Sequence, residues 1–432
     1  MQSGNRSTRK IAFVSPHCVL DYASGAATAT RDGLHVLSEQ GFQCEAFCGT
    51  RFDALQDGLI QDSLAQRGER YEIRKAKIGP YEGRLLYTTD GKLPVTLFEN
   101  VSTSGGSMSA AQAQAFLTGC DIFLRRNRPD LVWTYGGDPV AVAVQRLAKR
   151  LKIPVLFTLY NFAYGDRTAF EAVDCVAVPC EFSRRYYLER LGLACQVLPV
   201  VVNWKAAQAP NRSPRFLTFI NPQDIKGVYV FARIARELAR RRPDIPLLVT
   251  QGRSRPDALN APELGLVPHL AGQFPIETGC GGRNIITMPF APAPRTFYPT
   301  VYSLTKLLLM PSLWYESFGL VAAQAMLNGI PVLASNRGAL PETIGDAGFL
   351  FDVPARYTPE TPEVPMAEEV EPWVETIIRL WDDAEYYEHW SRAASERAQQ
   401  WHPDRLAPIY REFFSRITHQ PGPPLVPKKV AQ

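Results

Sequence analysis

The feature that most constrains the fold is an alternation of short apolar runs with longer helical patterns, which occurs twice along the chain. In the first half, residues 10–16 ("KIAFVSP") have the pattern of a buried strand, and residues 26–41 have that of a helix that ends at Gly41. Near-continuous apolar strands separated by helices are typical of a parallel sheet with both faces covered. The same order of elements restarts at residues 215–222 ("RFLTFINP"). We therefore predict an α/β protein with two doubly wound parallel-sheet domains.

The break between the two halves is a polar segment of small residues, "NWKAAQAPNRSP", which has the composition of a linker. The last residues, "QPGPPLVPKKVAQ", are typical of a disordered tail. The predicted organisation is an N-terminal domain at 10–203, a linker at 204–214, a C-terminal domain at 215–385, further helices at 386–418 and a tail at 419–432.

Two further stretches are predicted to be irregular. Residues 102–114 ("STSGGSMSAAQAQ") have the composition of a flexible loop, and residues 354–372 are too rich in proline for a helix or a central strand. Ligands in open α/β sheets bind outside the carboxyl ends of the strands. The domain pattern therefore predicts a site in a cleft, built from loops of both halves.

Composition excludes several classes of protein. Charged residues make up 21% of the 432 residues and the formal net charge is +4, which is too mild for a protein whose main partner is nucleic acid. The eight scattered cysteines form no disulfide framework, and the spacing of Cys44 and Cys48 is not that of a zinc site. The start, "MQSGNRSTRK", lacks the apolar segment of a signal peptide, and no apolar run reaches membrane-spanning length. We expect a cytoplasmic protein with at most peripheral membrane contact.

The strongest candidate site is a helix start. Ser317, Phe318 and Gly319 precede a helical pattern that begins at Leu320. A helix N-terminus exposes unpaired N–H groups with a partial positive charge, and a small turn before it lets these groups approach an anion. This stretch is a candidate seat for a phosphate or diphosphate.

Two polar side chains flank that seat. Glu316 stands in front of the helix, where its charge would repel a phosphate, so it is better suited to binding hydroxyl groups of a neutral sugar. Gln324 shares a helix face with Leu320 and Leu327, an odd place for a solvated amide, and could bind ribose hydroxyls. The alternative is structural: a capping acid and an amide satisfied within the core.

Residues 311–351, from "PSLWYESFGL" to "DAGFLF", resemble the signature region of the family 4 retaining glycosyltransferases, which adopt the GT-B fold. The resemblance extends over nearly the whole chain and is weakest at residues 50–115. It implies two Rossmann-like domains that face each other across a cleft. The family motif is a glutamate that contacts the donor sugar, seven residues, and a glutamate that holds the nucleotide ribose. Glu316 matches the first position, whereas Gln324 occupies the second and lacks the charge of a carboxylate.

A second element, "FINPQDIKGVYVFARIA", resembles the family segment whose arginine and lysine bind the donor phosphates. Lys226 and Gly227 match it. The arginine position falls at Asn221, so one cation is missing. Arg253, after the next strand, could replace it, although a solvated loop residue is the simpler interpretation. Lys226 in turn could be an ordinary surface lysine at a helix start.

The resemblance also assigns residues of the N-terminal half. Gly25 and Ala26 match the glycine-rich loop after the first strand, which approaches the donor phosphates; the alternative is an ordinary turn. Family members often carry a histidine where this chain has Tyr160, with Asn161 beside it, and this position faces the reacting sugar. Tyr160 could equally pack at the strand end. His17, at the end of the first strand, is the histidine best placed to enter the cleft, although a lone histidine is usually structural.

In the C-terminal half, the resemblance places the loop that follows residues 285–288 against the nucleotide base. Backbone groups around Met288 and Phe290 would read the edge of the base. Phe290 could instead belong to the core.

Together these residues imply a retaining, metal-independent glycosyltransferase of the hexosyltransferase type, with a nucleotide-diphosphate sugar as donor. No Asp-x-Asp metal motif occurs, so no metal and no further cofactor are expected. The acceptor, whether a glycan, a lipid-linked precursor or a small molecule, is left open, as are the donor base and the oligomeric state. By the same resemblance, the helices at 386–418 cross back to the N-terminal domain. A nucleotide-sugar binding protein with weak or lost transfer activity is the alternative, because Asn221, Tyr160 and Gln324 depart from the family pattern.

Overall fold

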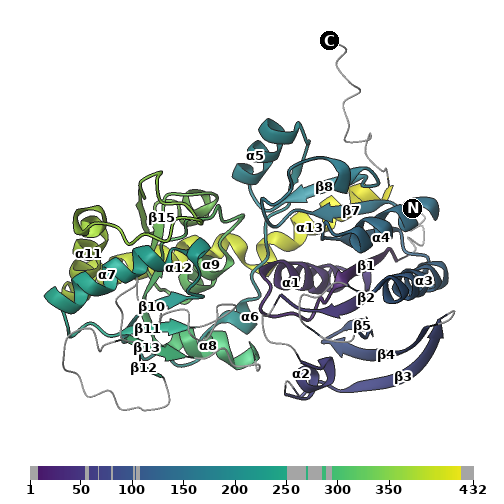
Figure 1. Ribbon diagram of the computed structural model, residues 1–432, viewed down its shortest axis with the longest axis horizontal. Coiled ribbons are helices and arrows are strands. Elements are labelled where there is room, and N and C mark those ends of the chain that lie inside the picture. The colour runs from purple at the N-terminus through teal and green to yellow at the C-terminus, as the bar shows by residue number, and fades with distance from the viewer. Residues whose placement is uncertain are drawn as a thin grey trace, which may run out of the picture. The chain divides into compact units, whose positions relative to one another are not determined.

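The computed structural model describes residues 8–53, 58–66, 68–78, 81–100, 103, 108–250, 269–270, 285–288 and 294–419. The chain divides into two compact units. The first contains residues 1–201 and 403–432, and the second contains residues 202–402. Each unit is built on one β-sheet (Figure 1).

The first unit contains a nine-stranded sheet with the order β3-β4-β5-β2-β1-β6-β7-β8-β9. Strand β1 lies in the middle and pairs in parallel with β2 and β6. The strands are β1 (Lys10–His17), β2 (Gln43–Arg51), β3 (Tyr71–Ile78), β4 (Tyr81–Asp90), β5 (Leu93–Phe98), β6 (Leu131–Thr134), β7 (Val155–Thr158), β8 (Cys175–Val178) and β9 (Gln196–Val197).

Helices of the first unit pack on this sheet (Figure 1). They are α1 (Gly25–Glu39), α2 (Ile60–Gln66), α3 (Ala110–Asn127), α4 (Pro139–Arg150), α5 (Glu181–Leu191) and α13 (Pro403–His419). Helix α1 contacts β2 and α13, whereas α3 and α4 contact each other and β1. The last described helix, α13, is thus part of the first unit.

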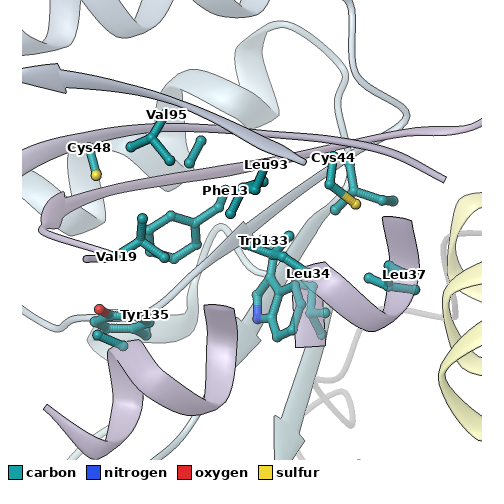
Figure 2. Packing of buried hydrophobic residues seen from close by; sticks show 14 of the residues in the cluster. Phe13, Val19, Leu34, Leu37, Cys44, Cys48, Leu93, Val95, Trp133 and Tyr135 are labelled. Carbon is teal, nitrogen blue, oxygen red and sulfur yellow. The ribbon is translucent and has the colours of Figure 1, made fainter. Parts of the chain in front are cut away.

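The core of the first unit lies between α1, α13 and the central strands. Phe13 and Trp133 are completely buried there, and Figure 2 shows them between Leu34 of α1 and Val95 of β5. The Trp133 ring lies 5.0 Å from that of Phe414 in α13, and its indole N–H donates to Thr158 Oγ1 at 2.6 Å. The C-terminal helix therefore supplies part of this core.

The second unit contains a seven-stranded sheet with the order β12-β13-β11-β10-β14-β15-β16, and its strand pairs are all parallel. Its strands are β10 (Phe216–Ile220), β11 (Leu247–Thr250), β12 (His269–Leu270), β13 (Ile285–Met288), β14 (Thr305–Met310), β15 (Val332–Ser335) and β16 (Phe349–Phe351). Its α-helices are α6 (Trp204–Ala207), α7 (Val228–Arg241), α8 (Pro294–Leu304), α9 (Leu320–Leu327), α10 (Leu340–Ile344), α11 (Ala367–Asp382) and α12 (Ala384–Ala398). The predicted fold class, two domains with parallel sheets, is confirmed.

One edge of the first sheet differs from a purely parallel pattern. Strand β4 pairs antiparallel with both β3 and β5, so residues 71–98 extend the sheet as a meander. Most residues of β3 are exposed, and the run therefore lacks the continuous apolar pattern from which the other strands were predicted.

The prediction of a flexible loop at residues 102–114 was wrong in part. Helix α3 begins at Ala110, where Ser109 and Gln112 form a capping box: the Ser109 side chain accepts from the Gln112 N–H, and the Gln112 side chain accepts from the Ser109 N–H. Residues 102 and 104–107 lie outside the described residues.

The prediction of no helix within residues 354–372 was also wrong for the last residues of that segment. Helix α11 begins at Ala367 and contains Pro372. A proline inside a helix costs about 3 kcal/mol. Here the same helix buries Val370, Trp373 and Val374, and burying side chains of this size contributes about 1.5–3 kcal/mol each. Burial therefore outweighs the local preference.

No α-helix among the described residues is both long enough and apolar enough to cross a membrane.

Candidate functional site

Two helices of the second unit begin without a side-chain cap. Gly227 precedes α7 and Gly319 precedes α9, both with positive φ (81° and 87°), and neither helix has an acidic residue in its first turn. In the first unit, by contrast, Ser24 and Asp138 cap α1 and α4 with their side chains. First-turn N–H groups without a side-chain acceptor carry a partial positive charge, which favours an anionic ligand.

The loops before these two helices are packed against each other. The backbone N–H groups of Leu313 and Trp314 both donate to the Ile225 carbonyl, at 3.1 and 3.0 Å. A Cβ atom at Gly227 would lie 1.9 Å from the Pro311 carbonyl oxygen, so only glycine permits this approach. The two helix N-termini are consequently held close together.

An ion pair joins the same two loops. Lys226 Nζ lies 2.5 Å from Glu316 Oε1, and the Ser312 hydroxyl donates to that same oxygen at 3.0 Å. Both charged side chains are largely covered, with 25% and 14% of their surface exposed. The structure thus brings together the two residues that the sequence proposed for the diphosphate and the sugar, and they bind each other.

A half-buried guanidinium supports the loop that carries Glu316. Arg337 donates to the carbonyl oxygens of Leu313, Tyr357, Val353 and Pro354 at 2.9–3.2 Å. Burial lowers the pKa of Arg337 from its ordinary value, but an arginine stays charged at neutral pH. Sequence reasoning missed Arg337, because its partners are carbonyl groups that no residue pattern reveals.

Two residues of the loop between β15 and α10, Gly338 and Ala339, pack against the backbone of Glu316. The Ala339 N–H donates to the Glu316 carbonyl at 2.8 Å, and Gly338 has a positive φ of 61°. A Cβ atom at Gly338 would lie 2.7 Å from the Glu316 nitrogen. The loop between β15 and α10 therefore holds the backbone of Glu316 in place.

The structure gives Gln324 an internal partner. The hydroxyl of Tyr302, which is completely buried, donates to Gln324 Oε1 at 2.9 Å. Gln324 itself is half-buried in α9. This contact supports the structural alternative for the side-chain oxygen of Gln324. The role of Gln324 toward a ribose stays a prediction.

The other residues at the turn before α9 differ in how deeply they are buried. Phe318 is buried, its ring lies perpendicular to that of Trp401 with the two ring centroids 5.5 Å apart, and its carbonyl oxygen accepts from the Thr343 hydroxyl. Ser317 and Leu320 are half-buried. Phe318 therefore anchors the turn in the core, and only its backbone is suited to a ligand.

Asn221, at the position of the missing arginine, is a turn residue. It follows β10 with a positive φ of 65°, its N–H donates to the Thr250 carbonyl at 2.8 Å, and its side chain donates to Gln223 at 3.3 Å. Asparagine tolerates this conformation better than most residues. In this chain, Asn221 therefore serves the backbone geometry of the turn after β10.

The nucleotide-base loop is only partly described. Met288 ends β13 and is half-buried against Phe216 and Leu248. Arg253 and Phe290 lie outside the described residues. Their assigned roles stay predictions.

In the first unit, His17 ends β1 and forms a pair with a carboxylate. Its Nε2 lies 3.2 Å from Asp138 Oδ2, and Arg51 lies 3.6 Å from the same oxygen. Burial acts to raise the pKa of Asp138, but the hydrogen bond with His17 and the charge of Arg51 outweigh it, so this pKa lies below its ordinary value. The sequence singled out His17 but missed Asp138, which follows the neighbouring strand β6.

Tyr160 and the loop before α1 have structural contacts of their own. The Tyr160 hydroxyl lies 3.1 Å from Thr30 Oγ1 in α1, and burial raises its pKa to about 12. Gly25 is exposed at the first position of α1, with no atom within 4 Å of a Cβ placed there, and Ala26 is half-buried. Tyr160 fits the strand-end packing that was the alternative for it.

Among the described residues, no group of three or more His, Cys, Asp or Glu side chains is arranged to hold a metal ion.

Comparisons with known proteins bear on this region. Residues 290–397, which include Glu316 and Gln324, match the model of the family described as Glycosyl transferases group 1. A D-inositol 3-phosphate glycosyltransferase of Paenarthrobacter aurescens is 31% identical over 208 residues, which are 45% of this chain and 43% of that protein. The chain thus spans less than half the length of the first curated relatives that it matches.

Solved structures share the fold over nearly the whole chain. The catalytic domain of starch synthase IV from Arabidopsis thaliana, bound to ADP and acarbose, has a TM-score of 0.66 at 14% identity, covering 96% of this chain and 100% of that one. Anabaena HepE in complex with UDP-glucose has a TM-score of 0.59 at 16% identity, covering 94% and 99%. The chain therefore has the α/β fold of the GT-B glycosyltransferases, as the sequence predicted.

Substituting Gly227→Ala is expected to destabilise the second unit. The new Cβ would meet the Pro311 carbonyl at 1.9 Å, and a left-handed backbone costs a non-glycine residue about 1–2 kcal/mol. Gly41→Ala is the matched control, because Gly41 also has a positive φ, 87°, with no atom within 4 Å of its Cβ. Urea denaturation of both variants checks this. We expect Gly227→Ala to lose clearly more stability than the control, and equal losses would contradict the close packing of the two loops.

Proposed function

We propose that the protein is a retaining, metal-independent glycosyltransferase that transfers a hexosyl group from a nucleotide-diphosphate sugar to a glycan, a lipid-linked precursor or a small molecule. The observation that carries the proposal is the pairing of Lys226 and Glu316 between two helix N-termini that have no side-chain caps. The family match at residues 290–397 supports it.

The diphosphate of the donor is proposed to bind at these N-termini. The N–H groups that follow Gly227 and Gly319 would donate to its oxygens, and Lys226 would supply a positive charge. Negative charge develops on the diphosphate as the bond to the sugar breaks, and donors fixed in advance stabilise that charge without reorganising. Arg253 would add a second cation, with Asn221 at the position where the family has its arginine.

The sugar and the nucleoside are proposed to bind residues on either side. Glu316 would accept hydrogen bonds from sugar hydroxyls, and the half-buried amide of Gln324 would contact the ribose. Backbone groups near Met288 and Phe290 would contact the base. In the first unit, Gly25 and Ala26 would approach the phosphates, and Tyr160 and His17 would contact the transferred sugar.

The proposed reaction is a front-side displacement. The acceptor hydroxyl forms the new bond to the anomeric carbon on the face from which the diphosphate departs, and its proton passes to the leaving phosphate. The protein's contribution is then positioning and charge stabilisation.

A second candidate is a nucleotide-sugar binding protein with weak or lost transfer activity. The internal partners of Gln324 and Asn221, where the family signature has a glutamate and an arginine, favour this alternative. Calorimetry separates the two candidates, because a binding protein would show affinity for a nucleotide sugar without turnover with any acceptor.

Lys226→Ala and Glu316→Ala are expected to lower the rate of sugar transfer about 10- to 100-fold each, because each removes a hydrogen bond to or from a charged group. Transfer and donor hydrolysis are measured with a panel of uridine, guanosine and adenosine diphosphate sugars. The controls Lys205→Ala and Glu375→Ala alter exposed residues of the same unit and should leave the rate unchanged. Full activity in both site variants would refute the assignment.

The stereochemistry of the product tests the retaining mechanism. An α-linked donor is expected to give an α-linked product, because attack and departure occur on the same face. Proton NMR of the newly formed anomeric centre measures this directly. An inverted product would rule out front-side displacement and would make His17, with its partner Asp138, the first base to examine.

Metal removal tests the proposed charge stabilisation. We expect excess EDTA to leave the transfer rate within about twofold, since Lys226 and the helix N-termini supply the positive charge that a metal would otherwise provide. The rate is compared before and after chelation and again after Mg²⁺ or Mn²⁺ is restored. A loss on chelation that either ion reverses would contradict metal independence.

A further inference from the structure

The ion pair between Lys226 and Glu316 engages the two charged groups that a donor would use. The ammonium and the carboxylate are 2.5 Å apart, and Ser312 donates to the same carboxylate oxygen. A ligand that binds Lys226 must therefore compete with Glu316. This inference rests on the proposed function, which assigns the lysine to the diphosphate and the glutamate to the sugar.

The competition affects two ligands differently. A nucleoside diphosphate brings its own negative charge to Lys226 but offers Glu316 no hydroxyl group from a sugar. The carboxylate then stays close to the phosphates, where like charges repel, and it has lost its strongest partner. A nucleotide sugar provides sugar hydroxyls that can donate to Glu316, so the carboxylate exchanges one partner for another.

We propose that Glu316 is a specificity-determining residue that favours the nucleotide sugar over the nucleoside diphosphate product. Once the sugar has been transferred, Glu316 loses its hydroxyl partners and re-forms its ion pair with Lys226. The diphosphate thereby loses its cation and dissociates. The same pair that holds the two loops together in the free protein thus promotes product release.

A purely structural ion pair makes a different prediction. If the pair served only to hold the loops in place, removing the charge of Glu316 would disturb the proposed diphosphate site and weaken the binding of both ligands. If Glu316 competes for Lys226, removing its charge strengthens binding of the diphosphate and weakens binding of the nucleotide sugar. The two effects have opposite signs, so one variant distinguishes the two roles.

The experiment is isothermal titration calorimetry of Glu316→Gln with UDP, GDP and ADP, and with the glucose derivative of whichever diphosphate binds the wild-type protein. Glutamine keeps the size of the side chain and can still accept from Ser312. We expect the affinity for the diphosphate to rise about three- to tenfold and that for the nucleotide sugar to fall by a similar factor, as expected for one partly exposed ion pair. Glu375→Gln, on an exposed position of α11, is the control and should change neither affinity.

Two further variants make the result decisive. Glu316→Ala also releases Lys226 and should change the diphosphate affinity in the same direction, which guards against a glutamine variant that does not fold. Lys226→Met should weaken both ligands. If Lys226→Met changes neither affinity, the proposed function fails. If it weakens both while Glu316→Gln and Glu316→Ala leave the diphosphate affinity unchanged or lower, only the present inference is overturned.

Discussion

The proposed site depends on one interaction, the ion pair between Lys226 and Glu316. It joins a loop that follows β10 to a loop that follows β14, two neighbouring strands of the parallel sheet. Because carboxyl ends of parallel strands meet at one sheet edge, residues 90 positions apart in sequence come into contact. Each loop leads directly into a helix, so the pair, together with the hydrogen bonds of Leu313 and Trp314 to the Ile225 carbonyl, sets the spacing between the two N-termini. These contacts bring a charge, its counter-charge and two sets of peptide N–H groups together.

The backbone around the pair carries a small cost to local stability. Gly227 and Gly319 adopt left-handed conformations that leave their helices without side-chain caps, each of which would contribute roughly a few tenths of a kcal/mol more than glycine. Arg337 offsets part of this cost, because its guanidinium joins the Leu313 carbonyl of the Glu316 loop to carbonyl groups of residues 353–357. Rigid support of this kind is what fixed electrostatic stabilisation requires, since donors that must reorganise lose their advantage.

The sequence predicted the features that depend on residues close together in the chain, and it could not predict contacts between residues far apart in the chain. The alternation of apolar runs predicted both sheets, and the local signals before Leu320 predicted a helix start with its turn. Strands β3 and β4 and helix α3 were missed, because most residues of β3 are exposed, β4 mixes exposed and buried positions, and α3 follows a glycine-rich stretch. Contacts between distant residues were out of reach: Tyr302 with Gln324, and Asp138 with His17, require knowledge of which elements are neighbours. The roles of Arg253 and Phe290 stay predictions.

The position of α13 has a consequence for how the chain acquires its structure. Phe414 packs on Trp133, and the Tyr410 hydroxyl donates to the Pro199 carbonyl, so the first unit needs residues that are synthesised after the whole second unit. The second unit, at residues 202–402, is contiguous and leaves the ribosome before them. During translation, the N-terminal sheet therefore keeps an apolar surface uncovered until α13 emerges, while the later-encoded second unit can already be complete. A chain interrupted after residue 402 would keep Lys226 and Glu316 and lose the helix that completes the core of the first unit.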